Sequence, residues 1–60
     1  MDSFRKYNRV VKRFLVNKHK WDSDRANKWI HSHTKYMQAM WEDSNSEEVT
    51  AHYIANTKED

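Results

Sequence analysis

The sequence predicts an all-α fold, a small three-helix bundle, and three observations lead to this prediction. Apolar residues recur with helical spacing along most of the chain. Gly and Pro are both absent, so tight hairpins that need a positive φ are not expected. Two polar clusters, residues 17–24 and 42–46, divide the chain into three segments. The 60 residues fit one small domain, 1–60, with helices expected at about 3–18, 23–41 and 45–56.

The first segment has the pattern of an amphipathic helix. At about 100° per residue its apolar residues fall on one side. They are Phe4, Tyr7, Val11, Phe14 and Leu15. The opposite side carries five cations, Arg5, Lys6, Arg9, Lys12 and Arg13. Asp2 or Ser3 is expected to cap the first amides of this helix.

The second segment is expected to be one long helix with a broad apolar face. Asp22 is the expected N-cap, and Trp21 before it is expected to pack on Ala26. The face comprises Ala26, Trp29, Ile30, His33, Tyr36, Met37, Met40 and Trp41. Its width indicates contact with more than one neighbour.

The third segment is the weakest of the three. Ser44 and Glu47 have the spacing of a capping box, which favours a helix beginning near residue 45. The run EVTAHYI is also rich in residues that favour strands. Because an isolated strand would have no partner, we expect a short helix to Asn56, followed by a frayed tail, 57–60.

Charge is divided by position along the chain. Residues 1–35 have a net charge of +7 and residues 36–60 a net charge of −5. The basic face of the first helix therefore suits the phosphates of nucleic acid or an acidic protein, and its alternative interpretation is a solvated surface. Membrane binding is disfavoured because the apolar side of this helix is needed for the core. A helix-turn-helix is disfavoured because the third segment begins with Glu47 and Glu48, which phosphates would repel.

The eight apolar positions of the second segment exceed what one short partner helix and the weak third segment can cover, which predicts a protein contact. Aromatic residues and Met are enriched at the centres of interfaces. The candidate interface residues are Trp21, Trp41 and Tyr53. A second copy of the chain, forming a homodimer, is one expected partner, since small folds without disulfides are often reinforced by association.

Catalysis and metal binding find little support. The chain has no Cys, no glycine-rich phosphate loop and no zinc-protease motif, so we expect no enzyme, no cofactor and no small-molecule substrate. His31 and His33 are two residues apart and would point away from each other on a helix, which disfavours a metal site. His33 is expected at the edge of the core, with a ring nitrogen bonded to a backbone carbonyl.

These features predict a small, soluble, cytoplasmic binding protein. No apolar run approaches the roughly 18 residues that a membrane span needs. The expected function is that of a non-catalytic regulator, adaptor or inhibitor acting through protein–protein contacts. The alternative is a nucleic-acid-binding module that uses the basic face of the first helix. Size and composition are compatible with an accessory protein of a phage or mobile element, although no residue motif carries that comparison.

Overall fold

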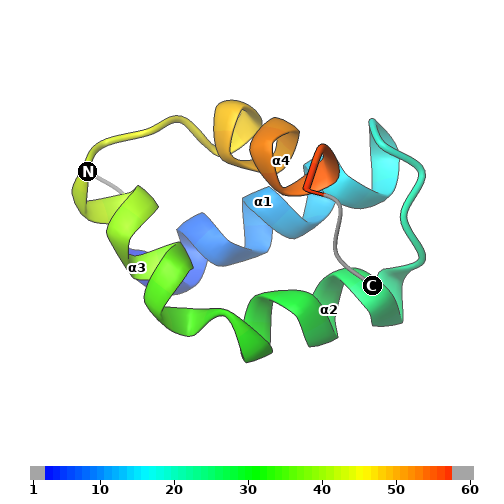
Figure 1. Ribbon diagram of the computed structural model, residues 1–60, viewed down its shortest axis with the longest axis horizontal. Coiled ribbons are helices and arrows are strands. Elements are labelled where there is room, and N and C mark those ends of the chain that lie inside the picture. The colour runs from blue at the N-terminus through cyan, green and yellow to red at the C-terminus, as the bar shows by residue number, and fades with distance from the viewer. Residues whose placement is uncertain (1–2, 58–60) are drawn as a thin grey trace.

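The computed structural model describes residues 3–57 and contains four helices and no strand over that range. They are α1 (Phe4–Asn17), α2 (Ser23–Ser32), α3 (Thr34–Glu42) and α4 (Glu47–Ala55). The all-α prediction is confirmed, but the count of three helices is wrong. Helix α2 runs back beside α1, and α3 turns away from the line of α2 (Figure 1).

The helix predicted over 23–41 is divided at His33, whose φ and ψ of −119° and 44° are not helical. Side chains here bond to preceding backbone carbonyls. Nδ1 of His33 donates to the Trp29 carbonyl at 2.8 Å, and Oγ1 of Thr34 donates to the His31 carbonyl at 3.0 Å. Such bonds compete with the regular helical ladder. A straight helix over this segment would be about 28 Å long, and the break lets α3 fold back onto the core.

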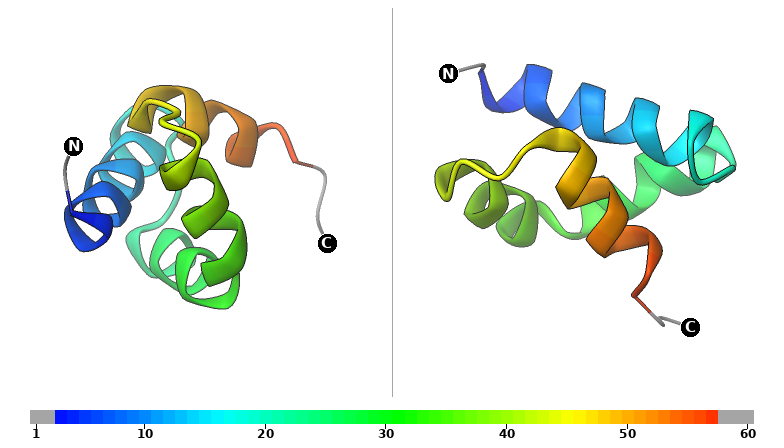
Figure 2. Two further views of the ribbon diagram at one scale, coloured as in Figure 1. Left: turned by 90° about the vertical axis from the view of Figure 1, so that its left-hand side faces the viewer. Right: turned by 90° about the horizontal axis from the view of Figure 1, so that it is seen from above.

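Helix α1 is central to the packing, because it contacts each of the other three helices and contacts α4 most extensively. Figure 2 shows α4 and α2 on different sides of it. Eight buried apolar residues form the core, namely Tyr7, Val11, Leu15, Ala26, Ile30, Met37, Ala51 and Ile54. Phe14 and Trp29 are only half-buried and pack around this centre.

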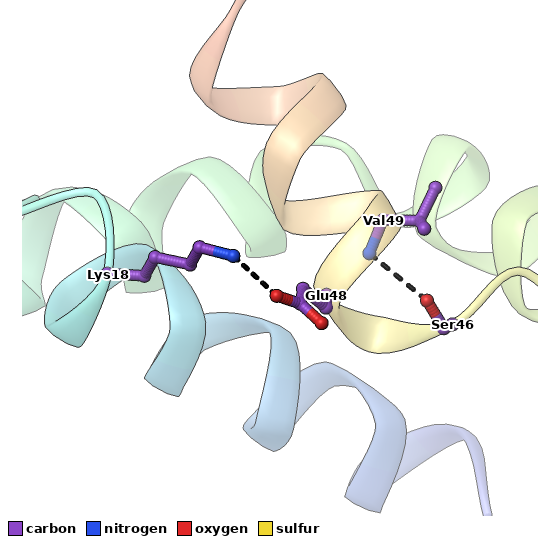
Figure 3. Close-up of polar contacts among 4 residues, drawn as sticks. All are labelled: Lys18, Ser46, Glu48 and Val49. Atoms are coloured by element: carbon purple, nitrogen blue, oxygen red, sulfur yellow. Dashed lines mark hydrogen bonds and ion pairs between the residues drawn. The ribbon is translucent and has the colours of Figure 1, made fainter.

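The helix caps agree with the sequence at two positions and differ at a third. Ser3 accepts a hydrogen bond from the Lys6 amide, and Asp22 accepts one from the Asp24 amide. The predicted capping box of Ser44 and Glu47 is wrong, because Ser46 is the N-cap of α4 and its hydroxyl accepts from the Val49 amide (Figure 3).

Two turns contain a left-handed residue, Lys20 with φ of 63° and Ser44 with φ of 61°. Ser44 ends α3 in a Schellman arrangement, in which the amides of Ser44 and Asn45 donate to the carbonyls of Trp41 and Met40. Glycine usually occupies this position, but the chain contains none.

The predicted tail, 57–60, lies outside the described residues except for Thr57. The Thr57 hydroxyl donates to the Tyr53 carbonyl at 2.9 Å, so this residue is tied to the end of α4.

Candidate nucleic-acid interface

Cations of α1 border a groove between α1 and α2. The groove has a volume of about 460 Å³. Helix α1 contributes Phe4, Arg5, Asn8, Arg9 and Lys12 to its lining. The facing side is formed by Asn27, Ile30 and His31 of α2 and by Thr34 of α3. We refer to this hollow as the basic groove.

The basic groove continues into a smaller hollow of about 250 Å³ toward the start of α2. The two hollows share Arg9 and Lys12, and the smaller one adds Arg13. Among the described residues that line either hollow, none is Asp or Glu. Four cations therefore line these two adjoining hollows, which we refer to together as the channel, and no Asp or Glu among residues 3–57 lines either of them.

The arrangement of the cations follows from the register of α1. Arg5, Arg9 and Lys12 are spaced four and three residues apart, so they form one row on the helix surface. The row spans roughly 10 Å, because each residue advances the helix by about 1.5 Å. Tyr7, Val11 and Leu15 on the opposite side are buried and fix the rotation of the helix. The core thus determines where the cations point.

Sequence reasoning identified all five cations of the first helix, and the structure separates them. Arg5, Arg9, Lys12 and Arg13 line the two hollows, whereas Lys6 lines neither. The sequence did not reveal the other residues that line the basic groove, especially Asn8, Asn27 and His31. The spacing of Asn27 and His31, four residues apart on α2, was the available signal, but only the packing of α2 beside α1 brings them to the cations.

The three predicted interface residues do not come together on one surface. Trp21 is half-buried, and the guanidinium of Arg25 lies 4.0 Å from the centre of its ring. Trp41 is also half-buried and packs against Phe4, with ring centroids 5.4 Å apart. Tyr53 alone is well exposed, at 54%. The linkers next to Trp21 and Trp41 lie toward opposite ends of the molecule (Figure 1).

Tyr53 belongs to a small exposed patch with Tyr36 and Val49, which we refer to as the tyrosine patch. These three are the exposed large hydrophobic residues among residues 3–57. Burial raises the pKa of the Tyr36 hydroxyl, and the neighbouring Tyr53 adds to this effect. Trp29 extends the cluster, because its ring meets Tyr36 edge-on at 5.6 Å.

His33 is held by contacts within the fold. The prediction for His33 is confirmed, since the residue is half-buried and its ring bonds to a backbone carbonyl. Its ring also stacks on Trp29 at 3.8 Å between centroids. Within residues 3–57, no three His, Asp or Glu side chains come together as metal ligands.

Over the same range, no helix is long and apolar enough to cross a bilayer.

Comparison with known proteins found no matching family model, no matching curated protein and no matching solved structure.

Proposed function

We propose that the protein is a non-catalytic module that binds nucleic acid through the phosphate backbone, with the basic groove as its contact surface. The observation that supports this most directly is that Arg5, Arg9, Lys12 and Arg13 line a channel to which no carboxylate of residues 3–57 contributes. A linear row of cations suits a ligand whose negative charges repeat along a chain. Contacts of this kind supply most of the affinity in non-specific nucleic-acid binding.

The position of the acidic residues is compatible with this role. Glu48 lies at the start of α4 and forms an ion pair with Lys18 from the C-terminal end of α1 (Figure 3). Glu42 accepts a hydrogen bond from Gln38 on α3. Neither carboxylate lines the basic groove. Phosphates can therefore approach the basic groove without facing these two carboxylates.

The test compares two double variants with the same change in net charge. One is Arg5→Gln with Arg9→Gln in the groove, and the control is Lys28→Gln with Lys35→Gln outside it. Fluorescence anisotropy of a labelled oligonucleotide at low salt measures binding, and circular dichroism checks the fold. We expect the groove variant to lose at least about tenfold in affinity and the control to lose far less. Equal losses would mean that total charge matters and the groove does not.

A second candidate function is self-association, and the tyrosine patch favours it. Exposed aromatic residues are enriched in interface cores. The three side chains of the patch are uncharged, and on α4 the charge of Glu48 is compensated by its ion pair with Lys18. In a two-fold dimer each residue near the axis meets its own copy, so a patch without net charge avoids self-repulsion. A second copy of this chain is therefore the partner that we propose for this surface.

A further inference from the structure

The lining of the basic groove combines charged and uncharged side chains. Arg5, Arg9 and Lys12, which we refer to as its rim, are joined by four uncharged residues that we refer to as its floor, namely Asn8, Asn27, Phe4 and Ile30. Ile30 is buried in the core, and Phe4 is held against Trp41. Cations alone would suffice to bind phosphate, so the carboxamides and the apolar floor indicate a second part of the ligand.

The chemistry of this floor matches a nucleobase. A carboxamide offers both a donor and an acceptor, which is the combination that Asn uses on the edge of adenine. An aromatic or apolar side chain accommodates the face of a base. Oδ1 of Asn8 is buried, and no donor among the described residues reaches it. A carboxamide in this state gains a hydrogen bond if it turns toward a ligand that donates.

The shape of the groove distinguishes single strands from duplexes. Its volume lies within the roughly 300–1,000 Å³ of small-molecule sites, so it has room for one base with its sugar. A paired base is stacked inside a duplex and cannot enter a hollow between two helices, whereas an unpaired base can be splayed out and inserted. A duplex would therefore reach the cations of the rim but not the buried side chain of Ile30.

We infer that the basic groove takes an unpaired base of single-stranded nucleic acid between Asn8 and Asn27 while Arg5, Arg9 and Lys12 hold the flanking phosphates. This inference rests on the proposed nucleic-acid binding and specifies the form of the ligand. It accounts for the polar and apolar residues of the floor, which a pure phosphate site does not require.

The experiment measures binding of a labelled single-stranded oligonucleotide and of its duplex at the same salt concentration. Wild type should prefer the single strand by at least about tenfold. Asn27→Leu removes one carboxamide and fills the floor, so it should remove most of this preference and leave duplex binding within about twofold. Gln38→Leu is the matched control, because it also replaces an exposed side-chain carboxamide by leucine, on α3 and outside the groove lining. Asn27→Ala repeats the test should the leucine disturb the fold.

The outcomes separate the two proposals. Preference for the single strand that is lost in Asn27→Leu and kept in Gln38→Leu supports the inference. Equal wild-type affinity for the single strand and the duplex overturns the inference, and so does an equal loss of affinity for both ligands in Asn27→Leu. In either case, a loss of affinity in the Arg5→Gln, Arg9→Gln variant would still support binding through the phosphate backbone. A wild-type protein that binds neither ligand at low salt overturns both.

Discussion

The hydroxyl groups of Tyr7 and Thr50 form a hydrogen bond of 2.5 Å inside the core, which joins α1 to α4 across 43 positions of sequence. Thr50 is the buried polar residue among residues 3–57, and its hydroxyl is satisfied by this contact. Burial raises the pKa of the Tyr7 hydroxyl, and the bond to Thr50 partly opposes that rise. The pair therefore fixes the register between the two helices that pack most extensively.

Removing one partner of this pair should destabilise the fold more than replacing both. Tyr7→Phe or Thr50→Val leaves a buried hydroxyl without its partner, which costs about 1–3 kcal/mol. In a domain of this size, each kcal/mol lowers the melting temperature by roughly 4–8 °C. The double variant should be more stable than the sum of the two losses predicts. Thermal denaturation of all four proteins tests this, and strictly additive losses would show that the two hydroxyls do not interact.

The Lys18–Glu48 ion pair should make a small, pH-dependent contribution to stability. The hydrogen bond from Lys18, together with its charge, holds the pKa of Glu48 below its ordinary value of 4.5. Because the folded-state pKa is the lower one, the contribution is complete above the ordinary value and disappears as the pH falls through the folded pKa. Melting temperatures of wild type and Glu48→Gln should thus differ slightly at neutral pH and converge in acid. A difference that is unchanged in acid would contradict the ion pair.

Binding of single-stranded nucleic acid should depend on salt in proportion to the cations of the channel. Four cations line the two hollows. At roughly −0.7 per neutralised phosphate, the slope of log K against log salt should be no steeper than about −3. Arg9→Gln should flatten the slope by about 0.7, and Lys35→Gln should leave it unchanged. A steeper wild-type slope would require contacts outside the channel.

Self-association through the tyrosine patch should be sensitive to a charge placed at its centre. Sedimentation of the wild type at micromolar concentration should reveal a dimer. Tyr53→Arg places like charges against each other in a two-fold contact, so this variant should sediment as a monomer. Gln38→Arg adds the same charge at an exposed position of α3 that is not one of the three patch residues, and it serves as the control. A wild type that is monomeric at every concentration would exclude the dimer.

The sequence could predict those features that depend on local spacing. The buried side of α1 follows directly from the helical period, and the N-caps Ser3 and Asp22 follow from residue type. The break at His33 was missed because neither Pro nor Gly marks it. It arises from the bonds that His33 and Thr34 make to earlier carbonyls, which are compatible with the same periodic pattern as a continuous helix.

The candidate site could be predicted only in part, because part of it depends on how two helices pack. The five cations were visible because they lie on one helix. The floor of the groove combines Asn8 of α1 with Asn27 of α2, and their proximity depends on how the two helices pack. Phe14 and Trp29 show a related limit of periodicity, since both lie on the apolar faces of their helices yet are only half-buried at the margin of the core.

The left-handed backbone of Ser44 has a practical consequence for protein engineering. A residue with a Cβ in this conformation carries a cost on the order of 1 kcal/mol that glycine does not. Ser44→Gly should therefore raise the melting temperature, although the added flexibility of the unfolded chain offsets part of this gain. Ser44 lies in the turn after α3, outside the basic groove. A parent protein with this substitution would be more stable, so that variants with destabilising replacements at the groove would stay folded and their binding could be measured.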